Sequence, residues 1–314
     1  MIESRLSGRD LVAALVVAVL WGLNFVVMKS SLRDFTPFQL GAARYLLATL
    51  PLIFFIRPPA LPWKWVVLFG LLVGVGQFGF LFSALKVGMT ASLASVLMQT
   101  HVFFTALFGY LLLREGISRQ LGVGLVLAAL GLVCFVMNFV TQGATGTAGA
   151  APVVAVTVLG FGLTLCGAVS CALSNIVPRK AQQINSDYDA LAFVVWSSAV
   201  PIIPFIALSS LLDADASRWL SAAAWSHVPW TGWLAVAYLG WVATIGGYLL
   251  WTGLLKRHPA NRVAPFALAV PVLGLASGML LLGETITAWQ WAGIALIGCA
   301  LACVMFGGRW LNRG

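Results

Sequence analysis

The chain has 314 residues, of which 61% are hydrophobic and only 9% are charged. A soluble globular domain carries about 25% charged residues, so this chain has more apolar surface than one soluble core can bury and is predicted to lie in a lipid bilayer. Its net charge of +9 sits mainly in short connections between apolar segments, which indicates contact with lipid headgroups and excludes nucleic acid as a partner.

Ten apolar segments are long enough to cross the hydrocarbon core, which takes about 20 residues. Each is predicted to be an α-helix, because a backbone in lipid must satisfy its own hydrogen bonds. The first is expected to stay uncleaved, because no small-residue cleavage site follows it. In chain order the segments cover residues 11–29, 37–56, 65–85, 91–113, 120–139, 153–177, 190–212, 230–255, 263–282 and 289–307.

Basic residues are distributed unevenly over the connections. With the N-terminus in the cytoplasm, thirteen lysines and arginines fall in inside segments and four in outside segments, while Arg44 lies within the second span. Cytoplasmic loops carry an excess of Lys and Arg, so both termini are predicted to be cytoplasmic.

The two halves of the chain resemble each other. Asn24 precedes Lys29 by five residues, as Asn175 precedes Lys180. Each half has five spans, and an odd number of crossings inverts the second half relative to the first. We therefore expect an all-α membrane protein with a five-helix repeat over 1–140, a linker over 141–152 and a second, inverted five-helix repeat over 153–314.

The short loops lack the motifs of other protein classes. There is no G-x-x-x-x-G-K-[ST] nucleotide loop, and the three histidines are scattered. The five cysteines lie within apolar segments and are read as packing residues. We expect no enzyme and no cofactor. Inverted repeats are typical of secondary transporters with a substrate site near the midplane, and a non-transporting membrane sensor or assembly protein is the alternative.

Polar residues inside spans are the candidate substrate contacts, because such residues are costly in lipid. Asn24 and Asn175 are repeat mates that could either bind substrate or join helices. Trp21 lies one turn before Asn24 and could line the same surface. Gln77, one turn from Gly74, is a further candidate.

The fourth span carries polar groups on two faces. Ser92, Ser95 and Gln99 share one face at about 100° per residue, whereas His101 and Thr105 lie nearly opposite. Either Gln99 or His101 is expected to contact the substrate while the other packs on a neighbouring helix. His101 could also carry a proton, although a structural role is the more common one for such a histidine.

Charged and aromatic groups complete the candidate list. Arg44 either extends to the membrane surface, where Asp34 could reach it, or attracts a substrate carboxylate. Thr244 and Tyr248 belong to an aromatic and hydroxyl stripe that either lines a pocket or packs. Glu284 and its mate Glu115 are expected at a water interface.

Four stretches carry a family resemblance: LWGLNFVVMKSSL (20–32), FVVWSSAVPIIPF (193–205), GWVATIGGYLLW (240–251) and RVAPFALAVPVLGLASGMLLLGE (262–284). They resemble the EamA branch of the drug/metabolite transporter superfamily. The resemblance implies two inverted five-helix repeats and export of small amino-acid metabolites across a bacterial inner membrane. Within the branch the chain is most similar to exporters of cysteine and O-acetylserine, with exporters of drugs or other metabolites as the alternative. His101 stands where the family pattern suggests a glutamine-like residue.

Overall fold

A computed structural model describes residues 7–113, 119–144, 156–185, 188–213, 225–258, 263 and 266–311, and every regular element within them is helical. Eight helices in this part of the chain are long and apolar enough to cross a membrane, and they coincide with eight of the predicted spans. Large apolar side chains such as Ile203 (77% exposed), Leu211 (79%) and Leu280 (83%) point outward. Lipid is the solvent that suits such a surface.

The elements follow one another in a simple order. The first group comprises α1 (Gly8–Ser31), α2 (Pro37–Thr49), η1 (Leu52–Phe54), α3 (Trp63–Gly70), η2 (Leu71–Gly79), α4 (Phe80–Lys86), α5 (Ala91–Met98), α6 (His101–Leu113) and α7 (Arg119–Ala144). The second comprises α8 (Val158–Ile184), α9 (Ala190–Ala199), α10 (Ile202–Leu212), α12 (Trp230–Ala237), η4 (Tyr238–Gly246), α13 (Gly247–Arg257), α15 (Ala269–Leu282) and α16 (Ala288–Leu311). Several predicted spans are thus composites, such as α3–η2–α4.

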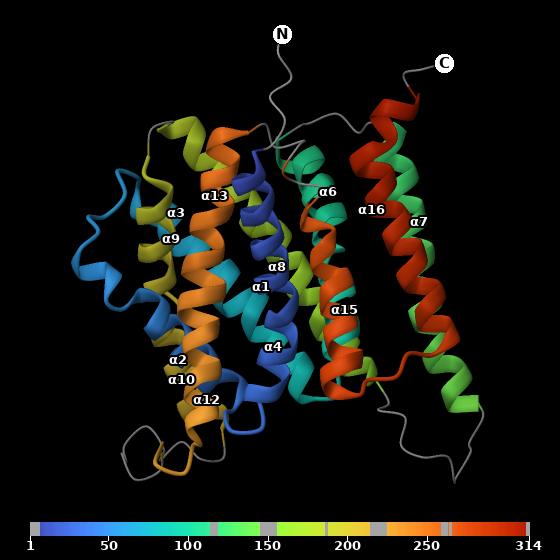
Figure 1. Cartoon of the computed structure of the whole chain (residues 1–314), viewed down its shortest axis with the longest axis horizontal. Helices are drawn as coiled ribbons and strands as arrows, with labels where there is room; N and C mark the ends of the chain where they lie inside the picture. The colour runs from blue at the N-terminus through green and yellow to red at the C-terminus, as the bar shows by residue number, and fades with distance from the viewer. Residues whose placement is uncertain are drawn as a thin grey trace.

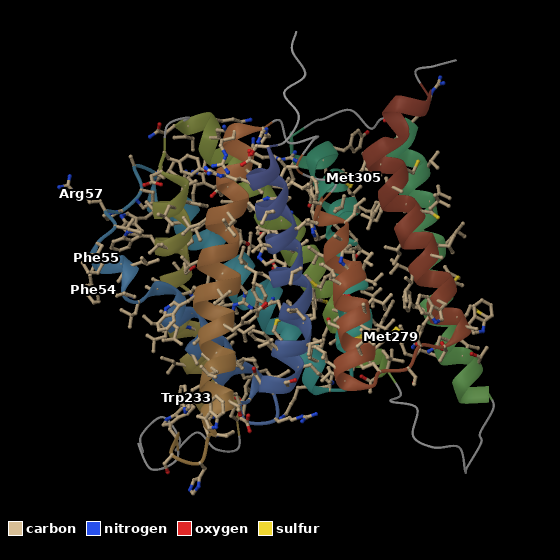
Figure 2. All side chains as sticks on the ribbon, in the orientation of Figure 1. Phe54, Phe55, Arg57, Trp233, Met279 and Met305 are labelled. Carbon is tan, nitrogen blue, oxygen red and sulfur yellow. The ribbon has the colours of Figure 1, made fainter. Side chains whose placement is uncertain are left out.

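Three predicted boundaries differ from the structure. The span predicted over 37–56 contains α2, which ends at Thr49 before Pro51, a residue without a backbone N–H; Phe54 and Phe55 then point away from the bundle (Figure 2). The span predicted over 263–282 contains the shorter helix α15 within its described residues. The helix predicted to end at 177 continues as α8 to Ile184 with Pro178 inside it.

The helices form a bundle with a separate pair at one edge. Helix α1 lies between α13 and α15, whereas α7 and α16 lie side by side at the edge (Figure 1). Glycines allow this pair to approach closely: a Cβ added at Gly131 would lie 3.1 Å from the Gly293 carbonyl oxygen, and one added at Gly293 would lie 3.0 Å from that of Gly131. Small residues at such crossings are typical of membrane helices.

The start of α1 and the end of α16 lie at the same end of the bundle (Figure 1), which we call the proximal end. At the opposite, distal end, charged side chains cap helix termini. Lys29 Nζ donates to the carbonyl oxygens of Leu85 (2.6 Å) and Met89 (2.8 Å), and Lys86 Nζ donates to that of Leu32 (2.7 Å). Cations at helix C-termini stabilise the exposed carbonyl groups.

Glu284 completes this distal cluster. Its carboxylate accepts hydrogen bonds from the backbone N–H groups of Ala91 (2.7 Å) and Ser92 (2.8 Å), the first residues of α5. Glu284 is 8% exposed, so the expectation that it lies at a water interface is wrong: the α5 N-terminus, which needs acceptors, provides a buried position for the charge. Its mate Glu115 lies outside the described residues.

One local feature occurs twice in the fold. Helices α3 and α12 each begin at a tryptophan, and each continues into a nine-residue π-helix, η2 or η4. Gln77 and Thr244 are the seventh residues of these two segments. A π-helix shifts the backbone hydrogen-bonding pattern, and such segments are frequent at functional sites.

Candidate functional site

Arg44 lies in the interior of the bundle and is 2% exposed. Its Nε and Nη2 both donate to Thr244 Oγ1, at 3.2 and 3.0 Å, and its guanidinium carbon stands 3.8 Å from the centre of the Phe78 ring. The expectation that Arg44 extends to the membrane surface is therefore wrong. Tertiary contact with the π-helix η4 holds the side chain inside, and none of the described carboxylates pairs with it.

Asn24 on α1 belongs to the same cluster. Its Nδ2 and Nη1 of Arg44 each lie 3.8 Å from the sulfur of Met28, which is fully buried. The Asn24 Oδ1 atom is buried and has no hydrogen-bond partner among the described groups. We call Arg44, Asn24, Met28 and Thr244 the Arg44 cluster.

Trp21 and Tyr248 lie next to this cluster. The Trp21 indole N–H donates to the Ala243 carbonyl oxygen at 3.0 Å, which ties α1 to η4. The Trp21 ring packs on Tyr248 and Trp251 with centroid distances of 5.7 and 5.5 Å. Tyr238 of η4 donates to the Leu20 carbonyl oxygen at 2.6 Å, a contact that the sequence patterns did not indicate.

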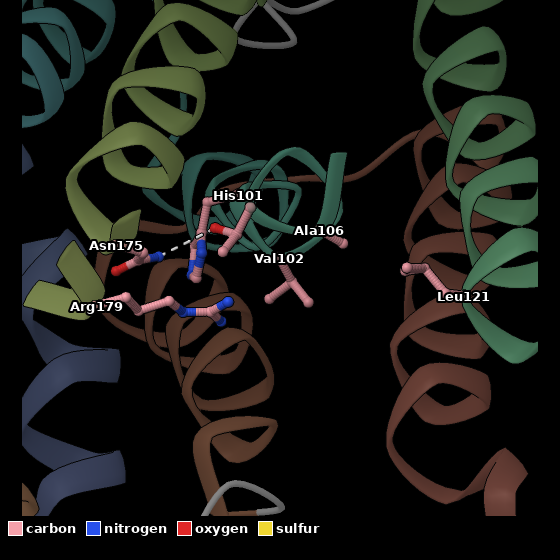
Figure 3. Close-up of a pocket in the computed structure, with 7 residues that line it drawn as sticks. His101, Val102, Ala106, Leu121, Asn175 and Arg179 are labelled. Atoms are coloured by element: carbon pink, nitrogen blue, oxygen red, sulfur yellow. Dashed lines mark hydrogen bonds between the residues drawn. The ribbon is translucent and has the colours of Figure 1, made fainter. Parts of the chain in front are cut away.

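A cavity of about 340 Å³ is lined by residues of α6, α7 and α8 (Figure 3). We call it the Asn175 cavity. Asn175 Nδ2 donates to Thr105 Oγ1 at 3.2 Å, and Nδ1 of His101 is buried without a partner in the described part of the chain. The cavity is lined by His101, Val102, Thr105, Ala106, Leu121, Asn175 and Arg179.

The fourth predicted span separates its two polar faces as expected. Ser92 donates to the carbonyl oxygen of Leu275 (3.2 Å). Ser95 Oγ, which donates within its own helix to the Ser92 carbonyl oxygen (2.7 Å), lies 3.3 Å from that of Pro271, and Gln99 Nε2 lies 3.4 Å from that of Ala267. His101 lines the Asn175 cavity instead. The helix is interrupted between α5 and α6, where Gln99 and Thr100 make i−3 backbone hydrogen bonds.

Gln77 is half-buried in η2 and lies in neither group. Beside it, Ser170 of α8 donates to the Leu72 carbonyl oxygen of η2 at 2.9 Å. This contact ties α8 to η2, as the Trp21 contact ties α1 to η4. Among the polar residues that line the Asn175 cavity, Arg179 is the one that sequence reasoning missed. Its position four residues after Asn175 places both on one face of α8, and this spacing could have indicated it.

The described residues contain no group of three or more His, Cys, Asp or Glu side chains placed to hold a metal ion. The polar interior instead consists of amide, hydroxyl, imidazole and guanidinium groups enclosed by apolar helices. Such groups can bind a small polar molecule through hydrogen bonds and charge. The fold and these sites define a multi-pass membrane protein of the transporter class.

The chain belongs to the EamA-like transporter family, whose sequence profile matches residues 9–137 and 158–306. It is therefore a transporter and not an enzyme. It is 40% identical over 304 residues to a protein of Salmonella typhimurium and 39% identical over 305 residues to one of Escherichia coli, with 97% of each chain covered. Both are named as probable amino-acid metabolite efflux pumps. A crystal structure with 20% identity and a TM-score of 0.62 covers 96% of this chain and 98% of its own, which supports the fold alone.

Proposed function

We propose that this protein exports small amino-acid metabolites, with cysteine and O-acetylserine as substrates, across a bacterial inner membrane. In this proposal ten helices span the membrane as two inverted halves, 1–140 and 153–314, joined by the linker 141–152. Both termini, and with them the proximal end, face the cytoplasm. The efflux-pump relatives that match 97% of the chain support the substrate class.

The proposed alternating-access mechanism rests on the different environments of Asn24 and Asn175, which occupy equivalent positions in the two repeats. Asn175 lines an open cavity, whereas Asn24 is 7% exposed and packed inside the Arg44 cluster. In transporters with inverted repeats, the two halves exchange conformations around one site. An open environment at one mate and a closed one at the other therefore suits alternating access.

In this proposal the Asn175 cavity lies toward the proximal, cytoplasmic end of the bundle, from which an exporter takes up its substrate. Thr157 donates to the Val87 carbonyl oxygen at 2.7 Å, which fixes the start of α8 at the distal end. Asn175 and Arg179 lie in the C-terminal half of α8 and hence nearer the proximal end. Near Asn24, by contrast, a Cβ on Gly22 would lie 2.6 Å from Leu273 Cβ, so α1 and α15 are in close contact.

Transport is tested by flux of labelled cysteine and O-acetylserine into proteoliposomes, with and without a pH gradient. We expect saturable uptake by the wild-type protein that excess unlabelled substrate inhibits. The His101→Gln variant tests proton coupling, because glutamine keeps hydrogen-bonding groups but does not titrate. Loss of pH dependence in this variant would assign coupling to His101.

Two alternatives give different results in this experiment. An exporter of drugs or other metabolites on the same scaffold would move neither compound but would respond to a wider substrate panel. A non-transporting sensor or assembly protein would show no flux for any compound, although the protein is folded.

A further inference from the structure

The Arg44 cluster has an unbalanced set of donors and acceptors. The Nε and Nη2 edge of a guanidinium binds a carboxylate through two parallel hydrogen bonds, one to each oxygen. Here both nitrogens donate to one hydroxyl oxygen, that of Thr244, whose own proton goes to the Leu239 carbonyl oxygen at 2.7 Å. Within the described chain no carboxylate reaches this buried cation, although an unpaired buried charge is costly.

The sulfur of Met28 is the acceptor for two further donors. Arg44 Nη1 and Asn24 Nδ2 both point to it at 3.8 Å, yet a thioether is a weak acceptor. Because both nitrogens lie 3.8 Å from the same sulfur atom, Arg44 Nη1 and Asn24 Nδ2 are at most twice this distance apart. Methionine is unbranched and has three rotatable bonds, so its sulfur can leave this position more readily than a branched side chain could.

Asn24 contributes the complementary chemistry. Its Oδ1 is buried and accepts no hydrogen bond from any described group, so it can accept one from an incoming N–H. A cation that lacks an anion thus lies close to an acceptor that lacks a donor. An α-amino acid carries the missing groups, a carboxylate and an ammonium joined through one carbon.

We propose that the Arg44 cluster recognises the zwitterionic backbone of an α-amino acid, with the carboxylate on Arg44 and the ammonium on Asn24 Oδ1. In the structure Thr244 Oγ1 occupies the Nε and Nη2 edge of Arg44 and the Met28 sulfur lies against Nη1, and substrate displaces both contacts when α1 and α15 separate. The proposal deepens the proposed function and rests on it. The Asn175 cavity has the same pair of groups, an amide and the guanidinium of Arg179, so substrate meets similar chemistry at both positions.

Three related thiols separate the contributions of the two charged groups. Cysteine carries both groups, cysteamine lacks the carboxylate and 3-mercaptopropionate lacks the ammonium. Each is measured for flux into proteoliposomes under reducing conditions, with wild-type, Arg44→Gln, Arg44→Lys and Asn24→Ala protein. Arg33→Gln is the matched control, because it removes one positive charge from an exposed position at the distal end of α1.

We expect wild-type protein to move cysteine about tenfold or more faster than cysteamine, since a charge-assisted pair contributes about that factor. Arg44→Gln should lower cysteine flux to the cysteamine level and leave cysteamine flux unchanged, and Arg44→Lys should be intermediate because it keeps the charge but loses the planar fork. Asn24→Ala should remove the preference over 3-mercaptopropionate. Arg33→Gln should behave as wild type.

Equal loss of all three fluxes in Arg44→Gln would make the arginine a structural residue and overturn the proposal, as would unchanged selectivity. A second readout distinguishes failure of this binding site from failure of the proposed function. It is the shift in melting temperature of the detergent-solubilised protein on addition of cysteine or cysteamine. A cysteine-specific shift that Arg44→Gln abolishes, without wild-type flux, would support the site and contradict the exporter assignment. Cysteine flux without selectivity over cysteamine would support the exporter and overturn the site, and neither shift nor flux would contradict both.

Discussion

Replacement of Glu284 by glutamine tests the distal cluster. The carboxylate accepts from Ala91 N at 2.7 Å and from Ser92 N at 2.8 Å, and a glutamine has only one oxygen for these two donors. Its NH₂ group would face the second N–H, so one buried donor loses its acceptor. Gln is otherwise close to Glu in size, which makes the variant a change of charge and hydrogen bonding with little change in packing.

The magnitude follows from the two contacts. A buried donor without an acceptor costs about 1–3 kcal/mol. Loss of a negative charge at a helix N-terminus adds about 0.3–1 kcal/mol, and up to about 2 kcal/mol where the site is partly buried. We therefore expect Glu284→Gln to lower the free energy of unfolding by about 2–4 kcal/mol.

Unfolding of the purified protein in mixed detergent micelles, followed by circular dichroism, measures this difference. Asp189→Asn is the matched control. Its carboxylate also caps a helix, through the N–H groups of Leu191 and Ala192 in the first turn of α9, but it is exposed to solvent. Because asparagine caps a helix as well as aspartate does, this substitution should cost only the lost charge, about 0.3–1 kcal/mol. A Glu284→Gln variant that is no less stable than Asp189→Asn would refute the reasoning.

Three further substitutions test other contacts. Arg44→Met should lower cysteine flux to the cysteamine level while leaving the free energy of unfolding equal or higher, because the buried guanidinium lacks an anion; a fall of several kcal/mol would contradict this. Gly76→Ala should lower stability by about 1–3 kcal/mol, because its Cβ would meet the Ser170 hydroxyl, and the double variant with Ser170→Ala should recover much of the loss. Gly131→Val should loosen the α7–α16 pair at Gly293, with faster proteolysis of this pair than in wild type.

Hydropathy predicted eight spans that the described part of the chain contains as helices long and apolar enough to cross a membrane, because membrane thickness sets the length of an apolar helix. Hydropathy gave a wrong boundary where the apolar segment extends beyond the end of its helix. Phe54 and Phe55 continue the apolar composition after α2, but Pro51 lacks the N–H needed to extend the helix and the two rings point outward. The span predicted to end at residue 177 continues as α8 to Ile184, because polar residues such as Arg179 and Lys180 do not stop a helix that extends beyond the apolar layer.

The candidate site was harder to predict than the spans. The intramembrane polar residues stand out in the sequence as unusual, but the burial of Arg44 depends on Thr244, which lies two hundred positions further along the chain. The sequence also treats Asn24 and Asn175 as equivalent mates. Asn175 lines a cavity and Asn24 is buried. In the proposed alternating-access cycle this difference belongs to one conformation, which a sequence shared by all conformations cannot specify. The substrate role of each candidate residue stays a prediction until transport is measured.

The central claim is alternating-access export of amino-acid metabolites, and exchange across a sealed membrane tests it most directly. Proteoliposomes are preloaded with unlabelled O-acetylserine or with buffer, and the initial rate of labelled cysteine uptake is compared. We predict faster, saturable uptake into the preloaded vesicles, because a carrier that has released cysteine inside can bind O-acetylserine and return with substrate bound rather than empty. Uptake that is linear with concentration and indifferent to preloading would indicate a pore and contradict alternating access. Absence of uptake with folded protein would contradict the substrate assignment.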